Sequence, residues 1–157
     1  MNIPDKLDRE ILKLLQEDAA QPIQQIADAV GLSVNPCWRR IRRMEAEGVI
    51  EGRVALVDPA KIGLGLTIFV RVKTGEHSAA WAQKFAAVID AMPEILECHR
   101  IGGDVDYLLK VIVPDIAGYD RTYKELIERL PSLADVSALF SMERLKSTTG
   151  LPIPAET

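Results

Sequence analysis

Residues 1–50 carry apolar side chains at steps of three and four positions, which is the spacing of one face of an α-helix. The pattern predicts three helices, over residues 7–15, 22–30 and 34–47. Gly31 and Gly48 end the second and third helices, because glycine readily adopts the left-handed conformation that follows a helix. Only Gly31, Leu32 and Ser33 separate these two helices, and so tight a link is typical of a helix-turn-helix.

The residues after the third helix predict a connection between two domains. A Gly-Arg pair lies between β-prone neighbours, so we expect 49–57 to form a small hairpin or a single strand. Asp58-Pro59 and the glycines that follow indicate a hinge. The predicted organisation is a helix-turn-helix domain over 1–50, a β segment and hinge over 51–65, and a second domain over 66–157.

The second half of the chain shows a weak internal repeat in which each copy reads strand, helix, strand. Pro93 separates helix from strand in the first copy, and Pro131 does so in the second. The predicted strands are 66–73, 95–101, 107–113 and 136–145, and the predicted helices are 78–91 and 116–130. Two such halves in tandem predict an α+β fold: a ferredoxin-like βαββαβ sandwich, with both helices on one face of a four-stranded antiparallel sheet.

A sheet with helices on one face only has a second face that needs a cover. The chain offers no further helix for it, so we expect another copy of the chain to bury this face and the protein to be a homo-oligomer. Residues 151–157, with two prolines, are expected to form a tail.

Composition narrows the class of protein. With 157 residues, of which 48% are hydrophobic and 27% charged, the chain can bury a core. No apolar run is long enough for a bilayer and no signal peptide is evident, so we expect a cytoplasmic protein with no membrane partner. Cys37 and Cys98 share no CxxC spacing, which argues against a disulfide or a zinc site. A net charge of −4 argues against indiscriminate nucleic-acid binding, but it says nothing about a local patch.

Such a patch is predicted on the third helix. A projection at about 100° per residue places Asn35 and a group of arginines on one side, opposite an apolar stripe to which we assign Cys37 and Trp38. The arginines are Arg39, Arg40, Arg42 and Arg43. We expect Ser33 to cap this helix through its hydroxyl, and Ser33 and Asn35 lie at the end that usually enters the major groove.

The alternative for these arginines is a solvated charged face. Such a face usually mixes signs, whereas no acid interrupts the chain between Asp28 and Glu45. Arginine also binds guanine or phosphate with two parallel hydrogen bonds. The pattern therefore favours a recognition helix that binds double-stranded DNA through Ser33, Asn35 and the four arginines.

Four segments in order carry a resemblance to a known family; they are 30–50, 58–64, 103–109 and 145–149. Together they make nearly the whole chain similar to the feast/famine transcriptional regulators, the leucine-responsive and asparagine-responsive family. The resemblance implies a winged helix-turn-helix, dimers that assemble further, often to octamers, amino acids bound between subunits, and bending or wrapping of promoter DNA. Pro36-Cys37-Trp38 and 147–149 look closest to a branch with cysteine-responsive members.

The loop from Gly102 to Asp106 has two interpretations. Its composition alone favours an ordinary turn with solvated acids. The resemblance implies instead that Gly103, Asp104 and Asp106 bind an amino-acid effector, with a carboxylate pairing its ammonium group. Gly102 stands where many relatives carry Thr or Ser, so cysteine, leucine and other small apolar amino acids all stay candidates. We expect no metal and no other cofactor.

Two rival functions stay open. A small ferredoxin-like domain can be an enzyme, but His77, Cys98 and His99 form no catalytic or metal-binding spacing, so we expect no enzyme activity. The other rival is a DNA-binding protein without a ligand, whose second domain only assembles the molecule.

Overall fold

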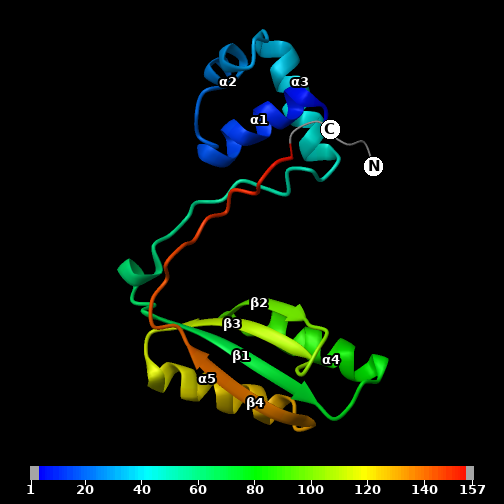
Figure 1. Ribbon diagram of the computed structural model, residues 1–157, viewed down its shortest axis with the longest axis vertical. Helices are drawn as coiled ribbons and strands as arrows, with labels where there is room; N and C mark the ends of the chain where they lie inside the picture. Colours follow the sequence, from blue (N-terminus) through cyan, green and yellow to red (C-terminus); the bar gives the residue numbers. More distant parts are fainter. Residues whose placement is uncertain (1–3, 155–157) are drawn as a thin grey trace. The chain divides into compact units, whose positions relative to one another are not determined.

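The computed structural model describes residues 4–154, which fall into two compact units. One unit combines residues 4–56 with 145–154, and the other is Val57–Arg144 (Figure 1). We predicted that the C-terminal tail belongs to the second domain. The structure groups it with the N-terminal unit instead, because Leu151 hydrogen-bonds to a side chain of the first helix.

The N-terminal unit contains the three predicted helices, α1 (Lys6–Glu17), α2 (Ile23–Ala29) and α3 (Val34–Ala46). Gly31 has φ 69° in the link between α2 and α3, a left-handed conformation that favours glycine. The helices pack around a small apolar core whose buried members are Ile11, Ile26, Ala27, Val30, Cys37, Ile41 and Met44. The helix-turn-helix prediction is confirmed.

The predicted β segment after α3 is wrong. Residues 51–57 are extended, but none of them is assigned to a strand, and the side chains of Val54, Leu56 and Val57 are exposed. A strand needs a paired neighbour, and the described part of the chain offers none here. The hinge that follows contains one turn of 3-10 helix, η1 (Pro59–Ile62), capped by the side chain of Asp58.

The second unit has the predicted ferredoxin-like topology. Its elements are β1 (Leu66–Thr74), α4 (Ala79–Asp90), β2 (Ile95–Arg100), β3 (Tyr107–Val113), α5 (Ile116–Arg129) and β4 (Leu133–Phe140). The strand order is β2-β3-β1-β4, with every neighbouring pair antiparallel. The fourth strand was predicted over 136–145 and lies earlier. Its ladder ends near Phe140, which pairs with Ile68, because β1 itself begins only two residues before.

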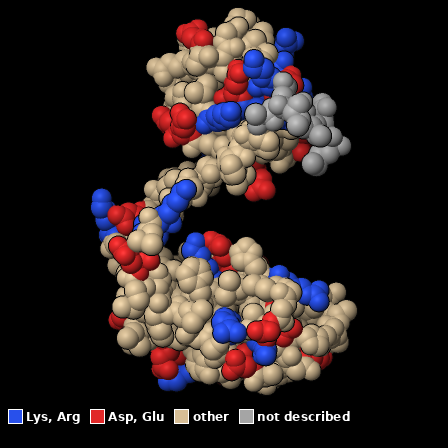
Figure 2. Space-filling view, viewed as in Figure 1, with Lys and Arg blue, Asp and Glu red and all other residues tan. Residues whose placement is uncertain are grey.

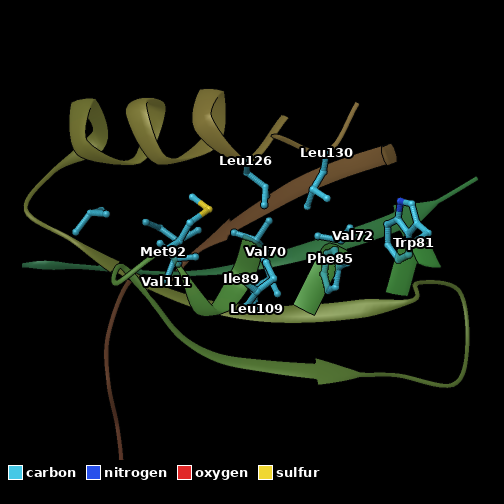
Figure 3. Packing of buried hydrophobic residues seen from close by; sticks show 12 residues of the cluster. Val70, Val72, Trp81, Phe85, Ile89, Met92, Leu109, Val111, Leu126 and Leu130 are labelled. Carbon is cyan, nitrogen blue, oxygen red and sulfur yellow. The ribbon is translucent and has the colours of Figure 1, made fainter. Parts of the chain in front are cut away.

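The core of this unit lies between the sheet and its two helices (Figure 3). Alternate residues of β1, Ile68, Val70 and Val72, face α4 and α5 and are almost completely buried. Trp81 and Phe85 on α4 stack with ring centroids 5.0 Å apart. Since both helices share this face, the opposite face of the sheet has no cover within the described residues.

Candidate functional site

Helix α3 presents its polar side to solvent. Cys37, Ile41 and Met44 are buried in the core, while Asn35 and Arg39 are exposed. Arg39 also lines a hollow of about 430 Å³, together with Leu32, Pro36, Arg40 and Arg43. The first turns of α3 therefore carry an open basic surface next to the link from α2.

Two of the predicted DNA-binding arginines make ion pairs inside this unit. Arg40 Nη1 lies 2.7 Å from Asp5 Oδ2 and 2.8 Å from Asp8 Oδ1, and Arg43 Nη2 pairs with Asp8 Oδ2. The Asp8 side chain is only 1% exposed, so its charge is compensated by these arginines. Acidic and basic side chains accordingly lie next to one another on the N-terminal unit in Figure 2.

The capping box at the start of α1 adds to this cluster. Asp5 Oδ1 accepts the backbone N–H of Asp8 at 2.9 Å, and Asp8 Oδ2 accepts the backbone N–H of Asp5 at 3.2 Å. The Asp8 N–H and the Arg40 guanidinium lower the pKa of Asp5. The bonds to Asp5 and Asp8 raise the pKa of Arg40. The sequence analysis missed both aspartates, although their spacing before a helix is a capping signal.

Trp38 was predicted to lie in the core, and this prediction is wrong. Its side chain is 54% exposed, and the Arg42 guanidinium carbon lies 6.0 Å from the ring centroid. Arg42 also pairs with Glu45 at 2.9 Å. Trp38 lies at the border of the apolar stripe, where smaller buried side chains already fill the core. The exposed side of α3 therefore carries an indole as well as arginines.

Ser33 occupies the N-cap position of α3, but its hydroxyl makes no capping hydrogen bond. The prediction that Ser33 is the N-cap residue is confirmed, but the prediction that its hydroxyl caps the helix is wrong. Ser33 is exposed, so its hydroxyl faces solvent at the end of the helix nearest Asn35.

The second candidate site is the loop between β2 and β3. Gly103 has φ 140° and open space where a Cβ would lie. Asp106 is used by the fold: its Oδ2 accepts the N–H of Thr74 at 2.8 Å, and its own N–H donates to Val72 O at 2.9 Å. Asp104 is exposed, and its carboxylate makes no hydrogen bond or ion pair within the described residues. The loop is thus held onto β1 by Asp106 and presents Asp104 to solvent.

The residues of the enzyme alternative do not form a catalytic group. His99 lies 3.3 Å from Glu97 on the exposed strand β2, and partial burial raises the pKa of the Cys98 thiol, which disfavours a thiolate nucleophile. Residues 4–154 contain no group of three or more His, Cys, Asp or Glu side chains that could hold a metal ion. Within the same residues, no helix is both long and apolar enough to cross a membrane.

A helix-turn-helix with an exposed basic side, joined to a ferredoxin-like domain, indicates a DNA-binding protein with a second, regulatory domain, and comparison with known families agrees. Residues 4–51 match a winged helix-turn-helix DNA-binding domain, and residues 67–151 match the Lrp/AsnC ligand binding domain. The chain therefore belongs to the Lrp/AsnC family of transcriptional regulators, which confirms the resemblance. The family consists of regulators rather than enzymes, so the prediction that the chain is not an enzyme is confirmed.

Individual relatives match along almost the full chain. The glutamate uptake regulatory protein of Zymomonas mobilis is 51% identical over 150 residues, which cover 96% of this chain and 91% of that protein. The crystal structure of an AsnC family regulator from Agrobacterium tumefaciens has a TM-score of 0.91 and 51% identity, and covers 94% of this chain and 96% of its own. The complex of the Neisseria meningitidis regulator NMB0573 with L-Met has a TM-score of 0.88 and 31% identity, with the same coverage of both chains. The fold class and the function as a DNA-binding regulator are thereby confirmed.

Proposed function

We propose that this protein binds double-stranded promoter DNA through the exposed side of α3 and changes its DNA binding when an amino acid binds near the loop of Gly103. The observation that carries the proposal is the exposed group of Asn35, Arg39 and Arg42 on a helix whose other side is buried. A helix of this kind fits the major groove, where arginine and asparagine distinguish base edges.

The six predicted residues take different parts in this proposal. Ser33, Asn35 and Arg39 contact the groove and the nearest phosphates, and Arg42 with Trp38 contacts the DNA beside them. Arg40 and Arg43 are held by Asp5 and Asp8, so their main part is to fix α3 on α1. The Arg40 and Arg43 side chains are 26% and 40% exposed, so their exposed N–H groups can also contact phosphates, although the Arg43 Nε is buried.

The effector proposal rests on the difference between the two loop aspartates. Asp104 offers a carboxylate that has no partner among residues 4–154 to an α-ammonium group, and Gly103 leaves the backbone open to an α-carboxylate. Asp106 positions the loop through Thr74. The L-Met complex of the Neisseria relative supports an amino acid as the ligand class.

The uncovered face of the sheet supports self-association, and from the family resemblance we propose a homodimer that assembles further, up to an octamer. Phe69 and Leu139 are paired neighbours on that face and are 37% and 52% exposed. A second copy that packs there would remove this apolar surface from water. We place the protein in the cytoplasm, where promoter DNA and free amino acids are both present.

A gel-shift assay with the protein's own promoter region tests the DNA surface. Arg39→Ala should weaken binding about tenfold or more, since a bidentate arginine contact contributes about 1–3 kcal/mol. The matched control is Arg129→Ala, which removes an arginine paired with Glu125 on α5 and should leave binding unchanged. Each phosphate contact should add about −0.9 to the slope of log affinity against log salt. Equal binding by both variants would reject α3 as the DNA surface.

A thermal-shift screen of the amino acids tests the effector proposal. A ligand at 100 times its Kd should stabilise the protein by about 2.7 kcal/mol. If no amino acid at millimolar concentration raises the unfolding temperature, the second unit serves only in assembly.

A further inference from the structure

The C-terminal segment 145–154 is attached to α1. The side-chain amide of Gln16 bonds to both backbone groups of one residue, since Oε1 accepts the N–H of Leu151 at 2.6 Å and Nε2 donates to Leu151 O at 3.2 Å. Further along, Arg9 Nη1 donates to Pro154 O at 2.9 Å. These bonds join side chains of α1 to backbone groups of the segment, so α1 holds the segment along its surface.

Apolar side chains of the segment and of the helices border a common hollow. A hollow of about 530 Å³ is bordered by Leu12 and Leu15 of α1, by Val49 and Ile50 after α3, and by Leu151 and Ile153 of the segment. Gln16 is exposed and the Leu151 side chain is 74% exposed. Bonds open to water contribute little each, so the segment is able to detach without unfolding the three helices.

The segment begins where the sheet ends. It follows β4, and β4 pairs with β1, the strand by which the chain first enters the sheet. The N–H of Ser141 donates to Thr67 O at 3.0 Å, so the incoming and outgoing chains leave adjacent strands at one end of the sheet. The incoming chain comes from the end of α3, and the outgoing chain finishes on α1.

Helix α1 connects the segment to α3. Arg9 binds the segment, while its neighbour Asp8 binds Arg40 and Arg43 of α3. A change in the position of the segment therefore acts on α1, the helix whose Asp8 fixes the orientation of α3.

We propose that residues 145–154 form a detachable second tether, through which the state of the ligand-binding unit reaches the DNA-binding helices. The first connection between the two units is the chain of residues 51–65, which joins α3 to β1, and the tether is the second. This inference rests on the proposed function, because it assigns a route to the amino-acid response.

The test uses the full-length Gln16→Leu/Arg9→Ala variant, which loses the three bonds but keeps every residue of the segment. Its matched control is Lys13→Ala/Glu17→Gln, which changes exposed residues on the same helix that make no bond to the segment. Hydrogen exchange measured by mass spectrometry reports attachment of the segment. Gel shifts with and without amino acid report the response.

In the Gln16→Leu/Arg9→Ala variant we expect exchange in 145–154 to become at least about tenfold faster, because three exposed hydrogen bonds to the segment are lost. Binding of the amino acid itself should stay unchanged, while its effect on DNA affinity should fall to less than half of the wild-type effect. The control should match the wild type in all three measurements.

Two results would overturn the tether. One is unchanged exchange in the variant, which would mean that the bonds do not hold the segment. The other is faster exchange with a full amino-acid response, which would place the coupling elsewhere. A wild-type protein without any amino-acid response contradicts the proposed function as well, and this is visible before any variant is compared.

Discussion

Replacement of Asp8 by alanine should loosen α3 from α1 without touching the exposed side of α3. Asp8 is 1% exposed and accepts hydrogen bonds from Arg40, Arg43 and the backbone N–H of Asp5. Its loss leaves two guanidinium groups without their shared partner. The Arg43 Nε is already buried with no hydrogen-bond partner among the described residues, so loss of Asp8 leaves the Arg43 guanidinium still less satisfied.

The expected cost follows from the exposure of the arginines. Removal of one partner of a fully buried ion pair costs about 3–5 kcal/mol. Here Arg40 keeps its bond to Asp5, and the two arginine side chains are 26% and 40% exposed, so water solvates part of the freed charge. We therefore expect a loss of about 2 kcal/mol for Asp8→Ala. Asp8→Asn, which keeps an acceptor oxygen, should lose about half as much.

Hydrogen exchange of α1 and α3 amides measures this loss in the N-terminal unit alone. A loss of about 2 kcal/mol corresponds to about thirtyfold faster exchange. The control is Asp28→Ala on α2, whose exposed carboxylate bonds only to Gln24 among the described residues, and which should change exchange little. Equal exchange in Asp8→Ala and Asp28→Ala would refute the view that Asp8 holds the arginines of α3.

Three further outcomes are expected. In calorimetric titration with an amino acid found to bind, Asp104→Ala should remove binding and leave stability unchanged. Asp106→Ala should also destabilise the loop by about 1–3 kcal/mol, because the Thr74 N–H loses its acceptor. Equal behaviour of the two variants would contradict the assignment of Asp104 to the ligand and of Asp106 to the loop. Phe69→Asp should shift light scattering toward smaller species, and an unchanged mass would show that this face is not an interface. The folded-state pKa of Asp5 is lowered, so its stabilising contribution is full above its unfolded pKa and is lost as pH falls through the folded value. In acid unfolding, the free energy of unfolding of the wild type should therefore exceed that of Asp5→Ala above about pH 4, and this difference should shrink as pH falls below about 4.

Periodic patterns predicted most of the fold. The steps of three and four residues located α1, α2 and α3 within about two residues, and the repeated strand-helix-strand pattern predicted the ferredoxin-like topology. These predictions succeed because burial of one face is a local property of the sequence. The β segment at 49–57 failed for the complementary reason: strand propensity was present, but a pairing partner was not.

The candidate site was less predictable, because its details depend on distant residues. A helical projection groups Arg40 and Arg43 with Arg39, but it contains no information about Asp8, which is 32 residues from Arg40. The same projection assigned Trp38 to the core on hydrophobicity, although the available volume is filled by smaller side chains. The roles proposed for Asp104 and Asp106 diverge because the backbone of Thr74 on β1 bonds to the Asp106 carboxylate, and the sequence of the loop does not show this contact.

The N-terminal unit is built from two distant stretches of the chain, residues 4–56 and 145–154, and this affects the order in which it assembles. During synthesis the three helices emerge first, but residues 145–154 emerge only after the whole ligand-binding unit. The DNA-binding unit is therefore completed after the ligand-binding unit, although its helices are made before that unit. A nascent chain whose helices have already folded still lacks the segment bound by Gln16, so the finished form of this unit arises only once the ligand-binding unit has been made.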